Sequence, residues 1–458
     1  MEPNRQAGNW DELWGGFRWQ VPARYNIARE CCGHWAGDRS RFALYYEDEA
    51  GTTSAWTFWD IQREANRFSN VLAALGVMRG DRVAILLPQR PETAIAHIAC
   101  YQMGAIALPL PHLSGPEALE FRLAHAAARV AVVDAPMLEK LAPVRGKLPA
   151  LRHVIGVACE NSPARESWLR AWTKLLPLAA TSYTPIDTAA DDPALLLYTA
   201  DAAGRPLGAL MAQRTLLGNL PGFVCSHDFY PRPGDMFWSP ADWASAGGLF
   251  DALLPAWNFG QPVLAYGGRF DPEKAFWLIE KYGVKNAFLV PAALETMVQA
   301  APKPQEKYDL GLRSIVSGGA VALGEAVFDW AGAELGVTIN EIFGQTEINH
   351  VAGGCSSVYA AKPGSMGRPY PGHRVAILDA AGNPVPTGGI GELCVQRYGD
   401  GVADPVFMTE YWNDPQATQD KYFGAGAAAW GRTGELAQQD AEGYLWRPGR
   451  AGGGKPSA

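Results

Sequence analysis

Hydrophobic residues along the chain follow two alternating spacings, one typical of helices and one typical of buried strands. Residues 60–75 carry apolar side chains every three or four positions and stop at Gly76, which predicts an amphipathic helix. Residues 83–87 form an unbroken apolar run, which favours a strand buried on both faces. The alternation continues with a helix opened by Pro91, a strand at 105–108, a helix at 117–128 and a strand at 130–133. This β-α-β-α-β order predicts a parallel sheet with crossover helices.

A second series of the same kind follows, and then the pattern changes. The series comprises strands at 195–199, 263–266, 287–290, 314–317 and 338–343, and helices at 272–282, 291–300 and 323–335. From residue 374 onwards, short runs at 374–379 and 392–396 around a turn at 381–384 predict a β-rich subdomain. We expect an α/β body over residues 1–369, the β-rich subdomain over 370–448, and a hinge remnant or tail over 449–458. The first 40 residues are rich in Trp and Gly and predict an irregular arm packed on the body.

Composition excludes several classes of protein. The 458 residues include 39 Lys and Arg against 47 Asp and Glu, a net charge of −8, which argues against nucleic acid as a main partner. Seven cysteines occur without a C-x-x-C pair, so free thiols in a reducing, cytoplasmic setting are predicted. The N-terminus has no signal-peptide pattern, and polar residues and Pro109 interrupt the most apolar stretch, 95–110, so no membrane span is expected. A homodimer is left open.

Several well-known catalytic motifs are incomplete or absent in this sequence. Gly449 to Lys455 matches the start of a Walker phosphate loop, but Pro456 follows where Ser or Thr is needed, and no helix can follow. Neither G-x-S-x-G nor H-E-x-x-H occurs, and the eight histidines lack metal-ligand spacing. Neither a serine hydrolase nor a zinc site is therefore indicated.

Four short segments, rich in glycine and in hydroxyl or charged side chains, carry a resemblance. They are Tyr198-Thr199 with the small-residue loop that ends at Gly208, Ser317-Gly318-Gly319-Ala320, Phe343-Gly344-Gln345-Thr346-Glu347, and 431–437 followed by 440–446 and Gly449-Arg450. In this order and spacing they resemble the adenylate-forming (AMP-binding) superfamily over nearly the whole chain. Residues 241–249 and 411–415 look most like medium-chain or aromatic acyl-CoA synthetases.

The resemblance implies a fold and a reaction. The implied fold is α/β, with two stacked, mostly parallel sheets, flanking helices and a smaller β-rich subdomain, as in the large domain of acyl-CoA synthetases. Such enzymes join a small carboxylic acid to the α-phosphate of ATP, release pyrophosphate, and then transfer the acyl group to the thiol of CoA. ATP, Mg²⁺ and CoA are the implied cofactors.

Roles for individual residues follow from the resemblance. Glu347 would hold Mg²⁺ and Thr346 would contact the α-phosphate, so both are candidate catalytic residues. The nucleotide-binding candidates are Thr199, Gly204, Gly319, Ala320, Phe343, Gly344, Glu435 and Arg450, and the acyl-pocket candidates are Trp243, Gly247, Gly248 and Gly318. A glycine pair lets the backbone approach a flat base, Phe343 could stack on adenine, and Glu435 would accept the ribose hydroxyls. Core packing is an equal alternative for Trp243, Gly247 and Gly248.

The phosphate loop departs from the family pattern Ser/Thr-Ser-Gly-Thr-Thr-Gly-x-Pro-Lys-Gly. Over residues 199–208, three hydroxyl positions have become alanine, a glycine has become Asp201, and the lysine has become Leu207. Each lost hydrogen bond to a charged partner is worth about 1.5–3 kcal/mol. Repulsion of pyrophosphate by Asp201 adds about 1–4 kcal/mol. The combined changes predict a loss in rate of about 10³ or more.

Two further departures concern the ribose site and the end of the chain. Glu435 stands where the family has aspartate. The acidic hinge of the family aligns with Gly452 and Gly453, and the chain stops eight residues after Arg450, so we expect the C-terminal lid domain, with its lysine, to be absent. A separate lid-domain protein is not indicated, although it is left open. Two functions stay open: an ATP-dependent acyl-CoA ligase of impaired activity, and a catalytically inactive acyl- or nucleotide-binding pseudoenzyme or regulatory protein. A decayed or engineered variant is a third interpretation.

Overall fold

The computed structural model describes residues 2–160, 167–201, 203–319, 321–399, 401–424 and 426–448. Ala320, Arg450 and the predicted tail over 449–458 lie outside these residues.

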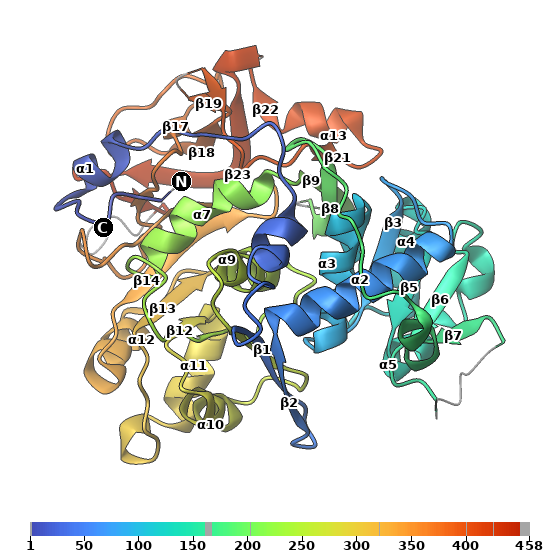
Figure 1. The fold of residues 1–458 in the computed structure, drawn as a ribbon. Coiled ribbons are helices and arrows are strands. Elements are labelled where there is room, and N and C mark those ends of the chain that lie inside the picture. Colours follow the sequence, from blue (N-terminus) through green and yellow to red (C-terminus); the bar gives the residue numbers. More distant parts are fainter. Residues whose placement is uncertain are drawn as a thin grey trace.

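The larger of the two sheets in the body contains most of the second predicted series of strands together with two strands from near the N-terminus (Figure 1). Its strand order is β16-β15-β14-β13-β12-β10-β11-β1-β2. The central pairs are parallel, and antiparallel pairs lie at both edges, so a mostly parallel sheet is confirmed. The strands are β1 (Phe42–Glu47), β2 (Thr53–Thr57), β10 (Phe237–Trp238), β11 (Val263–Tyr266), β12 (Asn286–Phe288), β13 (Ser314–Gly318), β14 (Ile339–Gln345), β15 (Ile348–Gly353) and β16 (Arg368–Pro369).

The second sheet contains the first β-α-β series. Its strand order is β21-β9-β8-β4-β3-β5-β6-β7, parallel from β8 to β7 and antiparallel at β8-β9-β21. The strands are β3 (Arg82–Leu86), β4 (Ile106–Pro109), β5 (Val130–Val133), β6 (His153–Gly156), β7 (Leu169–Ala171), β8 (Pro193–Ala200), β9 (Pro206–Ala212) and β21 (Glu410–Tyr411).

Helices separate and cover the two sheets. The helices between the sheets are α2 (Phe58–Ala74), α3 (Pro91–Met103), α7 (Thr215–Ser226) and α9 (Leu254–Asn258). Outside the second sheet lie α4 (Pro116–His125) and α5 (Ala135–Leu141), and outside the first lie α10 (Pro272–Tyr282), α11 (Pro291–Ala300) and α12 (Glu325–Trp330). Strand β3 shows why its run is unbroken: Val83 and Ile85 pack between the sheets, whereas Ala84 and Leu86 face the outer helices. The shorter helices are α1 (Trp10–Gly15), α6 (Trp172–Leu175), α8 (Ala246–Gly248) and α13 (Pro415–Asp420).

Several helix ends lie where nearby proline and glycine residues predicted them. Helix α2 begins with a capping box between Thr57 and Asp60 and ends just before Gly76, whose φ is +80°. Helix α3 begins at Pro91 and ends at the left-handed Gly104. All seven cysteines are buried and unpaired, as their spacing predicted.

Other boundaries differ from the sequence prediction. The strand predicted at 287–290 is β12, which ends at Phe288, because Pro291 already begins α11. The helix predicted at 323–335 begins at Glu325 and continues as a π-helical turn over Ala331–Leu335. Helix α7 was missed because it is buried on every side, so no amphipathic period marks it.

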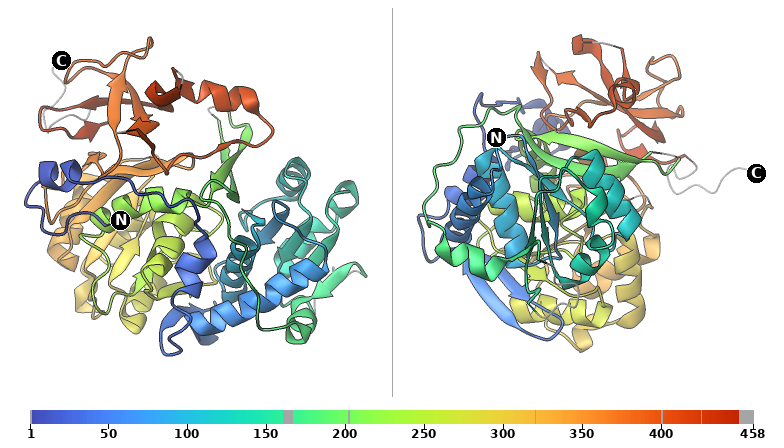
Figure 2. Two further views of the ribbon diagram at one scale, coloured as in Figure 1. Left: turned by 45° about the horizontal axis from the view of Figure 1, so that its top comes forward. Right: turned by 90° about the vertical axis from the view of Figure 1, so that its right-hand side faces the viewer.

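The C-terminal segment forms a separate antiparallel sheet with strand order β17-β18-β23-β22, to which β24 adds through β23. This segment, orange to red, lies at one end of the two-sheet body in both views of Figure 2. The strands are β17 (Val375–Leu378), β18 (Gly391–Gln396), β22 (Tyr422–Phe423), β23 (Trp430–Gln439) and β24 (Leu445–Trp446), with a small ribbon of β19 (Tyr398–Gly399) and β20 (Val402–Ala403). A β-rich segment is therefore present, and the domain boundary at residue 370 stays a prediction.

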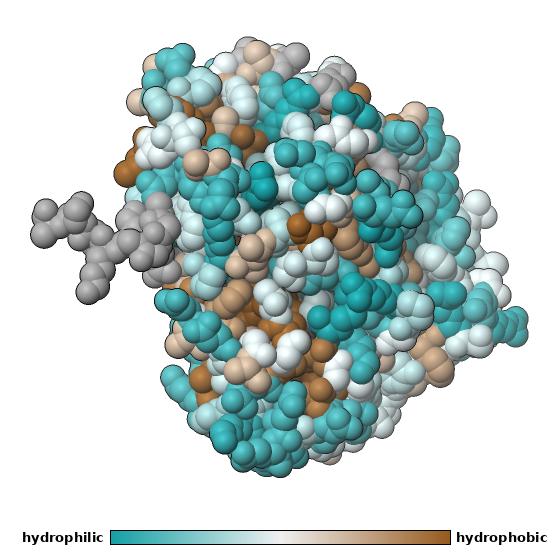
Figure 3. Space-filling view, turned by 90° about the vertical axis from the view of Figure 1, so that its left-hand side faces the viewer, coloured by the Kyte–Doolittle hydropathy of each residue, from teal (hydrophilic) through white to brown (hydrophobic). Residues whose placement is uncertain are grey.

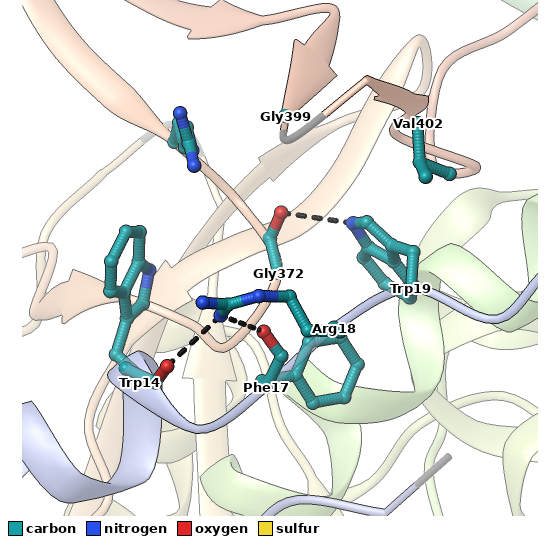
Figure 4. A pocket seen from close by; sticks show the side chains of 9 residues that line it. Trp14, Phe17, Arg18, Trp19, Gly372, Gly399 and Val402 are labelled. Carbon is teal, nitrogen blue, oxygen red and sulfur yellow. Dashed lines mark hydrogen bonds between the residues drawn. The ribbon is translucent and has the colours of Figure 1, made fainter.

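The Trp-rich arm, within the first 40 residues, forms hydrogen bonds to the turn before β17. Indole N–H groups of Trp10, Trp14 and Trp19 donate to backbone carbonyls within residues 369–373, at 2.9–3.0 Å. Trp14 and Trp19 flank Gly372 (Figure 4). Gly372 has φ +91°, and a Cβ there would lie 2.6 Å from the ring of Trp19. The arm therefore packs closely on a position that only glycine fits.

Substituting Gly372 with alanine should lower the free energy of unfolding by about 2–4 kcal/mol, because both the positive φ and the Trp19 ring oppose a Cβ. Thermal or urea unfolding of Gly372→Ala measures the effect. The control is Gly37→Ala, since a Cβ at Gly37 meets no atom within 4 Å. Equal stability of the two variants would show that the arm does not depend on this contact.

Exposed large apolar residues are scattered over the surface. Leu178, Leu113, Met78 and Val321 are between 65% and 87% exposed, and they lie far apart in the sequence, mostly in turns and connecting segments. On the face shown in Figure 3, polar side chains predominate and apolar ones gather near the centre. Among the described residues, no helix combines the length and the apolar character that crossing a bilayer requires.

Candidate functional site

A cleft of about 770 Å³ opens where the strand ends of both sheets meet the β-rich segment. Many predicted site residues line it: Thr199, Gly247, Gly318, Gly319, Phe343, Gly344, Thr346, Glu347 and Glu435. Segments up to 236 residues apart in sequence, from Thr199 to Glu435, therefore converge on one cleft. Such a crevice beyond the ends of parallel strands is where open α/β sheets bind ligands.

Three predicted residues do not line the cleft. Gly204 is exposed at the tip of the loop between β8 and β9. Trp243 is 1% exposed and packs in the core between the sheets. Gly248 is buried, and a Cβ there would lie 2.1 Å from the carbonyl oxygen of Asp242. Core packing therefore explains why Trp and Gly occupy positions 243 and 248, with no need of a bound ligand.

Glu347 is buried in the cleft wall, 7% exposed, with a cation beside it. Its Oε1 accepts a hydrogen bond from the hydroxyl of Tyr411 and lies 3.7 Å from Nζ of Lys421. Burial, and next the charge of Glu347, raise the pKa of Tyr411 well above its usual value, so its hydroxyl stays a donor. Oε2 of Glu347 has no hydrogen bond to any described residue and is available to a ligand.

The carboxylate of Glu347 fits a magnesium ion that arrives with a nucleotide. The part of the chain described here contains no cluster of three or more His, Cys, Asp or Glu side chains that could hold a metal. Mg²⁺ commonly takes one or two carboxylates and completes its shell with phosphates and water. A single free carboxylate oxygen therefore suits Mg²⁺ bound to ATP.

Glycines give the predicted nucleoside region its shape. A Cβ at Gly318 would lie 2.6 Å from Cγ1 of Ile342, and one at Gly344 would lie 2.3 Å from the backbone nitrogen of His350. Gly319 has φ +153°, and its carbonyl accepts from Arg447 at 3.1 Å. Phe343 is 5% exposed within an apolar cluster, so only part of its ring is open to a ligand. The side chain of Glu435 is half-buried and makes no hydrogen bond to a described residue.

The loop between β8 and β9 is closed by its own aspartate. The carboxylate of Asp201 accepts the backbone N–H groups of Ala203 and Arg205, both at 2.9 Å, and Nε of Arg205 at 3.1 Å. Arg205 also donates to Asp414 at 2.9 Å. These hydrogen bonds, first that of the Arg205 backbone, hold the pKa of Asp201 below its usual value. Two N–H groups of the predicted phosphate loop are thus already taken by an anion of the chain itself.

The same turn occurs twice in the β-rich segment. Asp379 accepts N–H groups of Ala381 and Asn383, and Asp440 accepts those of residues 442 and 444. Each aspartate accepts from the second and fourth residues after it, as Asp201 does. The substituted loop therefore has the geometry of an ordinary aspartate-capped hairpin turn.

Charge in the cleft is weighted towards acid. Among the described lining residues, the carboxylates are Asp201, Asp251, Glu347 and Glu435, and the cations are Lys421 and Arg447. Sequence reasoning did not single out Asp251, Asn349, Lys421 or Arg447. No motif marks them: Asp251 lies within an apolar run, and Lys421 follows a short helix outside the four segments that carry the resemblance.

Comparisons with known proteins show the family and the fold to which the chain is similar. Residues 34–407 match the family described as AMP-binding enzyme. The chain is 31% identical to the acetyl-coenzyme A synthetase of Bacillus subtilis, over 98% of this chain and 78% of that protein. The crystal structure of an acyl-CoA synthetase from Brucella canis superposes with a TM-score of 0.86 at 26% identity, over 97% of this chain and 80% of that one. An anthranilate CoA ligase in complex with anthranoyl-AMP shares the fold, with a TM-score of 0.83 at 23% identity, over 93% of this chain and 78% of that one.

Proposed function

This chain belongs to the AMP-binding enzyme family, and we propose that it is an adenylate-forming acid–CoA ligase whose first step is slowed by its own loop. In the first step, a carboxylate oxygen attacks the α-phosphorus of ATP, a mixed anhydride forms and pyrophosphate leaves. In the second step, the sulfur of CoA attacks the acyl carbon, a thioester forms and AMP leaves. Relatives named as acetyl-CoA synthetases and acyl-CoA ligases support this reaction class.

The residues that support the first step lie together in the cleft. Glu347 would hold Mg²⁺ through its free oxygen, and the ion would neutralise charge on the phosphates. Thr346 would donate to the α-phosphate, and Lys421 brings positive charge to within 3.7 Å of Glu347. Gly319, Phe343 and Glu435 would hold the nucleoside, and Gly247 and Gly318 would border the acid. CoA is assigned by family alone.

One observation supports a slow first step: Asp201 accepts the loop N–H groups that a β- or γ-phosphate would otherwise receive. Leu207 also brings no charge where the family pattern has lysine. Because the residues proposed for the α-phosphate and the nucleoside lie elsewhere in the cleft, the loss would fall mainly on the pyrophosphate portion of ATP. We infer that AMP binding is retained better than ATP binding.

Isothermal titration tests this inference directly. We expect AMP to bind, and ATP with Mg²⁺ to bind no more tightly than AMP, because the extra phosphates meet Asp201 and few donors. ATP with Mg²⁺ binding ten-fold more tightly than AMP would contradict the closed loop. Failure of both nucleotides to bind would contradict the proposed function itself.

A second candidate function is favoured by the same turn. A loop whose Ala203 and Arg205 N–H groups already donate to Asp201 suits a protein that binds nucleotide or acid without turnover. Such a protein would bind AMP but catalyse no carboxylate-dependent exchange of pyrophosphate into ATP. Exchange above background distinguishes the slow ligase from this binding protein.

A further inference from the structure

Asp251 places a buried acceptor in the cleft. The residue belongs to a π-helical turn, Leu249–Leu253, and is 4% exposed. Its Oδ1 accepts from Nδ2 of Asn349 at 2.8 Å and lies 2.7 Å from Nδ1 of His350. Its Oδ2 makes no hydrogen bond within the described ranges, and Asp251 and Asn349 both line the cleft. One carboxylate oxygen is thus fixed by the protein and the other is left for a ligand.

The network behind Asp251 holds the carboxylate in place. Asn349 also donates to Oδ1 of Asn219 at 2.7 Å, and Nε2 of His350 lies 3.0 Å from Oγ of Ser226. His350 has φ +56°, an unusual conformation for a residue with a side chain, and it is fully buried. A backbone held in this state, with both ring nitrogens in contact, indicates that the orientation of Asp251 is set before any ligand binds.

We propose that Oδ2 of Asp251 accepts a hydrogen bond from an amino or hydroxyl group of the acid substrate. A ligand that fills the cleft displaces water from Oδ2, and it leaves this acceptor without a partner unless the ligand itself supplies a donor. The acids that fit are therefore carboxylic acids with a donor substituent, in preference to plain hydrocarbon acids. This inference rests on the proposed function, since it assigns a substrate class to the same cleft.

The rest of the cleft agrees with this class. Gly247, Phe288, Val290 and Ile342 give apolar lining for the carbon skeleton of the acid. A Cβ at Gly247 would lie 2.9 Å from the ring of Phe288, so the space beside that ring depends on glycine. A carboxylate acceptor such as Asp251 forms a stronger hydrogen bond with an ammonium group than with a neutral hydroxyl, which favours an amino substituent.

Matched acids test the preference on the unmodified protein. The series are 3-aminopropanoate, 3-hydroxypropanoate and butanoate; 4-aminobutanoate, 4-hydroxybutanoate and pentanoate; and 4-aminobenzoate, 4-hydroxybenzoate and 4-methylbenzoate. Binding is measured by titration calorimetry with AMP present and absent. We expect a donor-bearing acid to bind at least about ten-fold more tightly than its hydrocarbon counterpart in at least one series. Equal or tighter binding of the hydrocarbon acid in every series would overturn the proposal.

Asp251→Asn tests the residue itself. The amide can keep its oxygen towards Asn349 and His350, and it then turns an N–H towards the cleft. The ratio of the affinity for a donor-bearing acid to that for its hydrocarbon counterpart should therefore fall at least about ten-fold. The control is Asp242→Asn: Asp242 accepts backbone N–H groups of His112 and Ala244 and does not line the cleft. Preference kept in Asp251→Asn would overturn the assignment, and the wild-type series decides alone if this variant fails to fold. AMP binding with no donor preference refutes only this inference, whereas absence of all nucleotide binding refutes the proposed function.

Discussion

Opening the β8–β9 loop should raise the rate of carboxylate-dependent pyrophosphate exchange by about 10²-fold or more. The variant combines Asp201→Gly, Ala203→Thr and Leu207→Lys. The first change frees the N–H groups of Ala203 and Arg205. The second adds a hydroxyl donor to the loop, and the third adds a cation at a position that lines the cleft. Two or three restored hydrogen bonds to a charged phosphate, at about 1.5–3 kcal/mol each, are sufficient for this gain.

The chain supplies a matched control for the first of these changes. Asp379 caps a turn of the same geometry outside the cleft, so Asp379→Gly removes an equivalent pair of hydrogen bonds without touching the site. Its exchange rate should equal that of the wild type, although its melting temperature falls. An opened loop with no gain in exchange, in a protein that still binds AMP, would show that the loop does not limit the first step.

Glu347→Gln should lower the same exchange rate by about 10²-fold or more and should weaken its dependence on Mg²⁺. The amide keeps an oxygen for Tyr411 but cannot supply the charge that Mg²⁺ requires. Binding of AMP without metal should change little, which separates loss of the metal contact from loss of the fold. The opened-loop variant, with its higher rate, is the most sensitive background for the measurement.

Exposed Glu410, close in sequence to Tyr411, provides the comparison for Glu347. Glu410→Gln should leave exchange and its Mg²⁺ dependence unchanged, because that carboxylate is outside the cleft lining. If Glu347→Gln exchanged pyrophosphate at the wild-type rate with the same Mg²⁺ dependence, the role assigned to Glu347 would be wrong.

The sequence predicted those parts of the fold that periodicity or local chemistry marks. Strand β3 and helices α2 and α3 appear where apolar spacing, Pro91 and Gly76 place them. Helix α7 and strand β15 were missed, since they are buried on all sides and give neither a period of 3.6 nor a clean alternation. The pairing order of the strands is a long-range property that was not predicted, and the layout of two stacked sheets came from the resemblance alone.

The candidate site was predictable only as far as its motifs extend. Thr199, Gly318, Thr346 and Glu347 belong to recognisable segments, and the structure brings them to one cleft. The loop substitutions suggested repulsion of phosphate, but not that Asp201 would accept the loop N–H groups of its own chain. Asp251 was missed because its meaning depends on Asn349, 98 residues away, which sequence spacing does not reveal.

Carboxylate-dependent exchange of pyrophosphate into ATP tests the central claim most directly. The unmodified protein is incubated with ATP, Mg²⁺, labelled pyrophosphate and the acid that binds best in calorimetry. We predict exchange above the background without acid, at a rate about 10²-fold or more below that of the opened-loop variant. Binding of AMP and acid with no exchange in either protein would contradict the account, and the chain would then be a binding protein built on a ligase fold.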